Sequence, residues 1–365
     1  MENTSSFIFI PDISGFSDFV NETEINHSQH IISELLEIII RSDSLGLKVS
    51  EIEGDAILFY SKEIPAVEDI LLQAQEMFIN FHHHLRKYET LRICQCGACK
   101  TASKLSLKFI AHAGSFSFIN VQGFHKPFGK AVVTAHKLLK NSIPNSEYLL
   151  LTDDLISLNE EPVNIVTQAK FEDVEELSTG LNYKYINLNY LNDLIPPVEH
   201  FDLPQKTKNP VRLRIIINRP MEEIHSWLID LEFKKKWNQN IDEIQYESDR
   251  INRVGYTHTC IINSMELKFQ TLANRFGNEK WIYGEKLLNP ALVREADFYY
   301  ILEKIDSYTS QLSFELHYIP FRGPLKLLSL LFRARLRFLY RESFSMLKTL
   351  LEKENNPRQI VHEKV

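Results

Sequence analysis

Phe-Ile-Phe-Ile-Pro-Asp-Ile-Ser-Gly-Phe occupies residues 7–16, and no other stretch says more about the architecture of this chain. Four consecutive apolar residues are typical of a buried strand, and the Pro-Asp pair after them predicts that the strand opens into a loop. A helical pattern follows from about Glu24 to Arg41. We therefore expect a central strand that delivers Asp12 to a loop.

The elements that follow alternate between strand and helix. Two strand-like runs, Leu47–Glu53 and Ala56–Tyr60, meet at Gly54-Asp55, which is a hairpin signal. The next predicted elements are a helix from Pro65 to about Arg86, a strand over Leu105–Ala111, a helix over Gly129–Lys140 and a strand over Tyr148–Leu151. Strand, helix, hairpin, helix and strand form the order of a ferredoxin-like α+β sandwich.

A proline-rich stretch divides the chain. Pro196, Pro197, Pro204 and Pro210 lie among polar residues, which predicts a first domain over residues 1–195, a linker over 196–210 and a second domain over 211–356. The second domain is expected to contain a strand over Val211–Ile217, a helix that begins at Pro220, several strands and a terminal helix from about Leu325 to Lys353. This order describes a sheet wrapped around a helix.

Composition excludes several classes of protein. The 365 residues are 44% hydrophobic and 24% charged, which is ordinary for a globular protein of about two domains. The net charge of −7 gives no global case for nucleic-acid binding. No apolar run has the length of a membrane span, and the first residues do not form a secretory leader, so we expect a cytoplasmic protein.

Asp12 and Asp55 are the candidate metal ligands. Both are expected at the ends of neighbouring strands, and paired carboxylates are the usual protein ligands of Mg²⁺ on nucleotide phosphates. Ser14, Gly15 and Phe16 precede a helix and are placed to offer backbone N–H groups to phosphate. The alternative is that both aspartates only cap turns, as aspartate often does.

Four motifs in order resemble class III nucleotidyl cyclase catalytic domains over about residues 6–158. They are Ile10-Pro-Asp-Ile-Ser-Gly-Phe16, Glu51-Ile-Glu-Gly-Asp-Ala56, Ala111-His-Ala-Gly114 and Phe128-Gly-Lys-Ala-Val-Val-Thr-Ala-His-Lys137. The resemblance implies that Asp12 and Asp55 hold two Mg²⁺ or Mn²⁺ ions on a nucleoside triphosphate. It also implies a homodimer in which two chains share each active site.

The chain departs from this family at the ribose and the base. Val133 stands where the family has a ribose-orienting asparagine, and Lys137 stands where an arginine stabilises the transition state. Lysine keeps the charge of arginine but loses its bidentate fork. The two base-reading positions are Glu51 and Lys126, whose opposite charges predict that they contact each other and that discrimination among purines is weak.

Three cysteines lie close together in the loop before the fourth expected strand, Leu105–Ala111. Cys94, Cys96 and Cys99 have the short spacing with which thiolates chelate a soft metal, so zinc is one interpretation. No fourth ligand is evident, because His82, His83 and His84 lie on the preceding helix and Cys260 lies in the other domain. The alternative is a tight loop of reduced thiols, or a pair that oxidises.

The second domain resembles START-like (helix-grip) domains over about residues 211–354. The resemblance rests on the strand Val211–Ile217, the helix that begins at Pro220 and the pair Trp237-Asn238. It implies a cavity for an apolar small molecule. Aromatic residues that could line it are Phe298, Tyr299, Tyr300, Phe314 and Tyr318.

The terminal helix also allows a weaker interpretation. Arg333, Arg335, Arg337 and Arg341 lie among apolar residues, as in helices that bind anionic membranes. The helix-grip arrangement already gives the apolar face of this helix a partner, so we do not expect membrane contact.

These features leave three functional hypotheses open. The chain is an atypical cyclase that releases pyrophosphate from a triphosphate, or a nucleotide-responsive scaffold without chemistry, or a carrier of a hydrophobic ligand whose first domain only dimerises. Asp12 and Asp55 favour the first hypothesis, whereas Val133 and Lys126 favour the second. The leading interpretation is a signalling protein that binds a metal–nucleotide complex and an apolar ligand.

Overall fold

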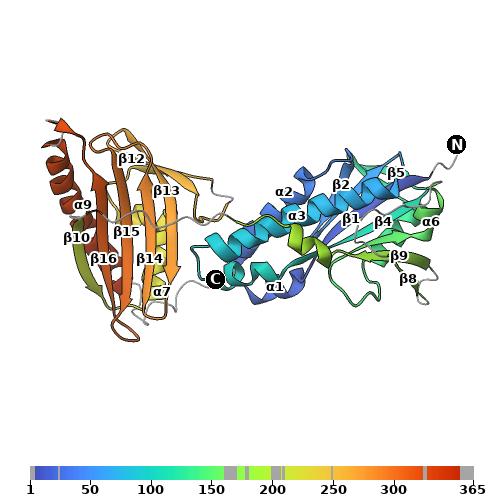
Figure 1. Ribbon diagram of the computed structural model, residues 1–365, viewed down its shortest axis with the longest axis horizontal. Coiled ribbons are helices and arrows are strands. Elements are labelled where there is room, and N and C mark those ends of the chain that lie inside the picture. The colour runs from blue at the N-terminus through green and yellow to red at the C-terminus, as the bar shows by residue number, and fades with distance from the viewer. Residues whose placement is uncertain are drawn as a thin grey trace. The chain divides into compact units, whose positions relative to one another are not determined.

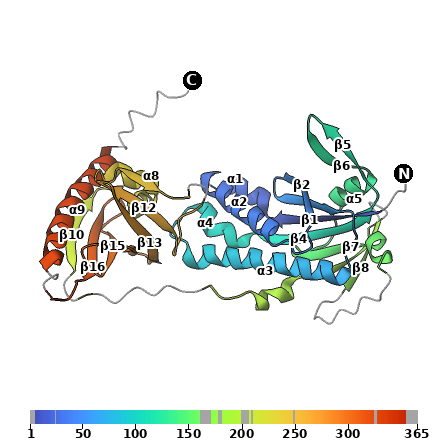
Figure 2. The same cartoon turned by 90° about the horizontal axis from the view of Figure 1, so that it is seen from above.

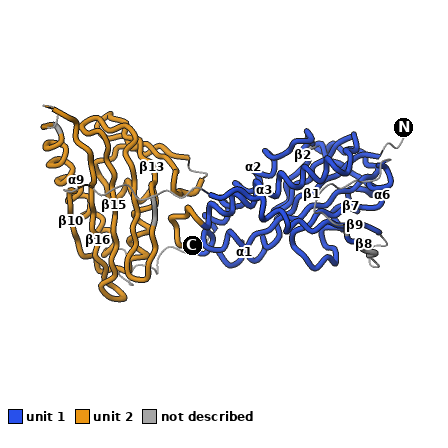
Figure 3. Tube along the Cα trace, in the orientation of Figure 1, with its two compact units in different colours: residues 1–89, 96–198 blue, residues 90–95, 199–365 orange. Residues whose placement is uncertain are grey.

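Two seven-stranded sheets, one in each half of the chain, dominate the structure (Figure 1). The computed structural model describes residues 5–23, 25–159, 171–176, 181–198, 207, 210–247, 250–323 and 327–353. The chain forms two compact units, the first made of Met1–Glu89 and Cys96–Val198 and the second of Thr90–Gln95 and Glu199–Val365 (Figure 3). A short segment from the first half of the sequence therefore belongs to the second unit.

The sheet of the first unit has the strand order β2-β3-β1-β4-β7-β9-β8. Its strands are β1 (Ser6–Ser14), β2 (Lys48–Glu53), β3 (Ala56–Ser61), β4 (Ser106–Gly114), β7 (Tyr148–Thr152), β8 (Phe171–Glu176) and β9 (Leu181–Asn187). β1 is antiparallel to its neighbours β3 and β4, whereas β4 and β7 are parallel. The order β2-β3-β1-β4 is that of a ferredoxin-like βαββαβ unit, which confirms the predicted α+β arrangement.

Helices pack on this sheet because successive side chains of a strand point to opposite faces. The helices are α1 (Phe16–Glu22), α2 (Ile25–Arg41), α3 (Val67–Leu91), α4 (Gly97–Thr101), α5 (Lys130–Leu138) and α6 (Asp153–Ser157). Ile8 and Ile10 of β1 belong to one core cluster with Ala135 of α5. Phe9 lies between them in sequence and stacks on Phe109 of β4, with ring centroids 5.5 Å apart. The central strand is thus buried on both faces, as its apolar run predicts.

A separate two-stranded hairpin joins β4 to α5. It consists of β5 (Ser117–Val121) and β6 (Phe124–Phe128), and it stands out from the main sheet (Figure 2). Gln122 and Gly123 form its turn with φ values of 48° and 91°, the left-handed conformations that a tight hairpin turn requires. Sequence analysis did not predict this hairpin, because it lacks a buried face and an alternating apolar pattern.

The second unit is an antiparallel sheet with the order β10-β16-β15-β14-β13-β12-β11. Its strands are β10 (Val211–Ile217), β11 (Glu243–Gln245), β12 (Thr257–Ile262), β13 (Met265–Phe276), β14 (Lys280–Leu287), β15 (Glu295–Lys304) and β16 (Ser310–Ile319). Its helices are α7 (Met221–Ile229), α8 (Leu231–Trp237) and α9 (Leu328–Lys353). The predicted order of strand, helix, strands and long terminal helix is present.

α9 is held to the sheet by aromatic contacts. Tyr340 stacks on Phe314 of β16 with ring centroids 4.2 Å apart, and Phe344 lies 5.6 Å from the same ring. These contacts bury one face of the helix, which agrees with the expectation that the sheet partners it. Among the described helices, none combines the length and the apolar character needed to cross a membrane.

The predicted linker over 196–210 lies mostly outside the described residues. In the described part of the chain, neither seven-stranded sheet contains strands from both sides of it. Within the range predicted for the first domain, Thr90–Gln95 belongs to the second unit. Arg92 forms a β-bridge with Arg253, and the N–H of Val254 donates to the carbonyl of Leu91 at 3.0 Å. Such long-range pairing leaves no local signal in the sequence.

Candidate functional site

Asp12 and Asp55 lie on neighbouring elements near the end of the central strand, although β1 runs on to Ser14 and Asp12 lies on the strand and not in the expected loop. Asp12 lies on β1 opposite Ala56 of β3 and Lys108 of β4. Asp55 occupies the turn between β2 and β3, and its carbonyl accepts a hydrogen bond from the N–H of Ile13 at 3.0 Å. This bond ties the hairpin turn to β1, so that both carboxyl groups lie on neighbouring strand ends.

Burial and mutual repulsion make this pair costly to ionise. Burial raises the pKa of Asp12 to about 6, the Lys108 ammonium opposes this rise, and the charge of Asp55 adds to it. The pKa of Asp55 is also raised, chiefly by burial. Two partly desolvated carboxyl groups that repel each other form a site that a cation would stabilise.

Lys108 is the residue of this site that sequence analysis missed. Its Nζ lies 3.6 Å from Oδ2 of Asp12 and donates to the carbonyl of Leu139 at 3.2 Å. The charge of Lys108 also opposes the rise that burial causes in the pKa of both aspartates. Its position opposite Asp12 in the register of β4 could have been found only from the strand pairing.

The loop after β1 has the conformation that a glycine permits. Gly15 has a φ of 85° and precedes the first turn of α1, where its carbonyl accepts from the N–H of Phe19 at 3.0 Å. The hydroxyl of Ser14 donates to the carbonyl of Ser146 at 3.5 Å. The expectation that Ser14, Gly15 and Phe16 face a phosphate stays a prediction.

Glu51 and Lys126 form the ion pair that their opposite charges predicted. The pair joins β2 to β6, and Glu53 lies 4.0 Å from the same ammonium. A hydrogen bond from Lys126 to Glu51 raises the pKa of the lysine. His136 of α5 approaches Glu53 at 3.5 Å. Oε1 of Glu51 is buried and has no hydrogen-bond partner among the described residues, so this carboxylate has an acceptor to spare.

α5 presents the two remaining predicted positions to solvent. Ala131, Val132 and Ala135 turn toward the core of the first unit, whereas Val133 is 53% exposed and Lys137 is exposed. Val133 and Lys137 are four residues apart and therefore lie on one face of the helix. The predicted role of Lys137 at the transition state stays a prediction.

The cysteine loop has a fourth member that spacing could not reveal. The ligand atoms of His27, Cys94, Cys96 and Cys99 lie within 4.8 Å of one another. The three histidines considered from sequence have other neighbours: His82 contacts Glu147, His83 the carbonyl of Pro196, and His84 Glu34. His27 lies on α2, far upstream of the cysteines in sequence.

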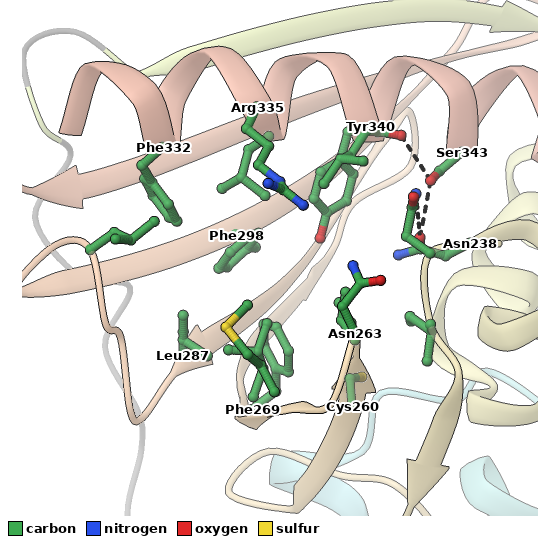
Figure 4. Close-up of a pocket in the computed structure, with 18 of the residues that line it drawn as sticks. Asn238, Cys260, Asn263, Phe269, Leu287, Phe298, Phe332, Arg335, Tyr340 and Ser343 are labelled. Atoms are coloured by element: carbon green, nitrogen blue, oxygen red, sulfur yellow. Dashed lines mark hydrogen bonds between the residues drawn. The ribbon is translucent and has the colours of Figure 1, made fainter. Parts of the chain in front are cut away.

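The second unit contains a cavity of about 470 Å³ between the sheet and α9 (Figure 4). Phe269, Leu287 and Phe298 line it from the strands, and Phe332 and Tyr340 line it from α9. Of the five aromatic residues proposed from sequence, only Phe298 lines this cavity. Tyr300 and Phe314 instead pack against Tyr340 and Phe344 of α9. Tyr299 packs in a cluster with Leu272 and Ile301. Tyr318 contacts Phe332.

Lys234, which lines the cavity, forms a buried ion pair with Glu285 behind it. Nζ of Lys234 lies 2.6 Å from both carboxylate oxygens of Glu285 and 3.2 Å from Nε2 of His258. Burial alone would raise the pKa of Glu285, but the ammonium beside it holds that pKa below its usual value. Arg335 of α9 also lines the cavity and is exposed, with its guanidinium turned toward the hollow (Figure 4). Sequence analysis considered Arg335 only as part of a basic helix.

Comparison with families and with curated proteins gives no function. A family described as "Protein of unknown function (DUF2652)" matches residues 32–148. The uncharacterized protein Rv2561/Rv2562 of Mycobacterium tuberculosis is 29% identical over 154 residues, which are 42% of this chain and 67% of that protein.

Solved structures similar to about half of the chain include cyclase domains. A bacterial light-regulated adenylyl cyclase is 16% identical with a TM-score of 0.37, over 53% of this chain and 96% of that one. The guanylate cyclase domain of RhGC from Catenaria anguillulae, in complex with GTP, is 16% identical with a TM-score of 0.37, over 51% and 96%. The adenylyl cyclase CyaB from P. aeruginosa is 14% identical with a TM-score of 0.34, over 50% and 93%.

Proposed function

We propose that the first unit is a divergent nucleotidyl-cyclase-homology domain that binds a nucleoside triphosphate together with Mg²⁺ or Mn²⁺. The observation that carries this proposal is the convergence of Asp12 and Asp55 beside Lys108. The cyclase-like motifs quoted above support it, because the aspartates of two of these motifs lie on neighbouring elements, β1 and the β2–β3 turn.

The donor chemistry of the aspartate pair fits a hard divalent cation. Mg²⁺ and Mn²⁺ take oxygen ligands, and usually one or two carboxylates complete their shell together with phosphate oxygens. A bound ion would neutralise the charge of a triphosphate and orient it. Lys108 approaches Asp12 at 3.6 Å, so a cation on the carboxylates would release its ammonium to pair with phosphate instead.

At the end of the proposed site that would face the nucleobase lies an ion pair, Glu51–Lys126, and not a metal site. Lys126 neutralises Glu51 through Oε2 of the carboxylate. The other oxygen, Oε1, is left as an acceptor for an N–H group of a purine. Because Lys126 already neutralises and hydrogen-bonds Glu51, we expect ATP and GTP to bind within a few-fold of each other.

Catalysis would need two copies of the chain. We propose that Val133 and Lys137, exposed on one face of α5, meet the triphosphate of a second copy in a homodimer. Valine cannot hydrogen-bond the ribose, and loss of nucleophile orientation is costly in rate. Turnover is therefore expected to be slow, and a nucleotide-responsive scaffold is the alternative without turnover.

Calorimetric titration of MnATP and MnGTP into the full chain tests the binding. We expect Asp55→Asn to weaken both nucleotides by about tenfold or more, since it removes half of the carboxylate pair. Asp193→Asn is the matched control, because Asp193 is an exposed aspartate of the same unit outside the site. Equal affinities for the wild type and Asp55→Asn would refute the proposal. Mass spectrometry of the incubated nucleotides then separates cyclase from scaffold by the presence of cyclic product.

The cavity of the second unit supports a second function. We propose that it holds an apolar small molecule, as its resemblance to START-like domains implies, with a polar end directed to Arg335. Leu339→Trp should fill the cavity and lower binding of a dansylated fatty acid by about tenfold, since Leu339 lines it. Phe338→Trp is the control, because Phe338 is 61% exposed and does not line the cavity. Equal binding by both variants would contradict the assignment.

A further inference from the structure

We infer that the cysteine loop is a closed zinc site whose fourth ligand is His27. The site is separate from the proposed nucleotide site and does not depend on it. Its ligand atoms are Nδ1 of His27 and the sulfurs of Cys94, Cys96 and Cys99, all within 4.8 Å of one another.

The nitrogen–sulfur distances lie within about 0.4 Å of those in a tetrahedral zinc centre. Nδ1 of His27 lies 3.2 Å from Sγ of Cys96 and 3.5 Å from Sγ of Cys99. Zn–N and Zn–S bonds of about 2.1 and 2.3 Å place a nitrogen and a sulfur about 3.6 Å apart across one edge of a tetrahedron. One ring nitrogen that approaches two sulfurs at nearly equal distance thus indicates a shared point between the three atoms.

The backbone of the loop is shaped to present thiolates. Cys96 caps α4, and its sulfur accepts a hydrogen bond from the N–H of Cys99 at 3.4 Å. Such N–H donors stabilise the charge of a thiolate and orient it toward a metal. Only Gln95 separates Cys94 from Cys96, so its thiol belongs to the same loop.

The donor set selects zinc rather than the ions proposed for the aspartates. Three thiolates and one imidazole are soft ligands, typical of a structural Cys₃His zinc site, whereas Mg²⁺ and Mn²⁺ prefer oxygen. Four protein ligands leave no open position, so the ion would be structural and not catalytic.

The elements around the site show what zinc would stabilise. His27 lies in the first turn of α2, and α4 packs beside α1 and α2 (Figure 2). The loop that carries the cysteines leads from α3 to β4, the strand that supplies Lys108. A zinc ion would therefore fix this connection to α2.

Metal analysis of the full chain, purified without added metal or chelator, tests the inference. We expect one equivalent of zinc per chain. After removal of zinc under reducing conditions, cobalt(II) should give the visible bands of a tetrahedral site and a thiolate charge-transfer band. Cys99→Ser and His27→Ala should each lower zinc affinity by more than about tenfold.

Two further variants separate ligation from packing. His27→Cys should retain one equivalent of zinc and strengthen the thiolate charge-transfer band of the cobalt form, which a merely structural histidine would not do. Cys260→Ser should leave the zinc content unchanged, because Cys260 is a buried thiol of the second unit. A folded chain that contains less than a tenth of an equivalent of zinc and gives no cobalt bands would overturn the inference. So would a disulfide among the three cysteines in the freshly purified protein.

Discussion

Lys234 and Glu285 form a buried ion pair in the second unit. Their side chains are 3% and 1% exposed, and the hydroxyl of Tyr283 donates to the same carboxylate at 2.7 Å. A buried pair of this kind is retained mainly because breaking it leaves one charge without a partner. The pair is therefore expected to control the stability of the unit.

Lys234→Met should destabilise the second unit by about 3–5 kcal/mol, because it leaves Glu285 ionised and unpaired. The double variant Lys234→Met/Glu285→Gln removes that charge and should recover at least half of the loss. Urea unfolding followed by tryptophan fluorescence measures both, since Trp227, Trp237 and Trp281 all lie in this unit. Equal stabilities of the single and double variants would contradict the argument.

His258 gives the second unit a dependence on pH. Burial lowers its pKa to about 3, with the Lys234 ammonium adding to the effect. The unfolded chain takes up a proton at His258 near pH 6.5, but the folded chain does not until about pH 3, so stability falls as the pH drops between these values. From pH 6.5 to 5.0 the loss should reach about 1.6 kcal/mol.

The tryptophan signal in urea at the two pH values measures this slope. His258→Gln should flatten it, and parallel slopes in the wild type and the variant would refute the assignment. Titration of Asp12 does not contribute to this measurement, because Asp12 lies in the first unit, which contains no tryptophan. Its effect on stability also has the opposite sign: because its pKa is raised in the folded state, protonation favours folding as the pH falls toward 4.

At the scale of elements, α5 packs closely against β4 at Gly114. A Cβ atom added to Gly114 of β4 would lie 2.8 Å from Cβ of Ala131. Real Cβ atoms do not approach so closely, so the glycine allows the helix to lie directly on the sheet. The position of α5 in turn sets where Val133 and Lys137 stand.

Gly114→Ala should move α5 away from the sheet and destabilise the first unit by about 1–3 kcal/mol, as overpacking commonly does. Hydrogen–deuterium exchange of the α5 amides is the measurement, and faster exchange is expected there than in α3. Unchanged exchange in α5 would mean that the helix accommodates the methyl group freely.

Elements with a buried face were predictable from the sequence, and those without one were not. The apolar run of β1 and the long amphipathic pattern of α3 identified both elements to within a few residues. The β5–β6 hairpin, α4 and the pair β8–β9 were missed, because their sequences are short or polar. Lys108 and His27 were missed for another reason: only strand pairing and helix packing bring them to the residues that the motifs identified.

For the whole molecule, the proposed shared site requires association. The hairpin exposes three apolar side chains: Ile119 is 39% exposed, Val121 59% and Phe128 60%. Val133, five residues after Phe128 on α5, is also exposed. Apolar residues gathered on one projecting element are typical of a contact surface.

Phe128→Glu should raise the dissociation constant of the homodimer by about tenfold or more, because it places a charge in the apolar contact. Phe338→Glu is the control, since Phe338 is 61% exposed on α9 of the other unit. Sedimentation velocity measures the dimer fraction of both variants. A wild-type chain that stays monomeric with nucleotide present would contradict the shared site.

The β-bridge between Arg92 and Arg253 has a consequence for inheritance and synthesis. The second unit completes its fold with a segment translated more than a hundred residues earlier, inside the gene region of the first unit. Recombination at the proline-rich junction would exchange the second unit without this segment. The two halves are therefore expected to be inherited together. A chimera joined at residues 196–210 should fold well only when residues 90–95 come from the same parent as its second half.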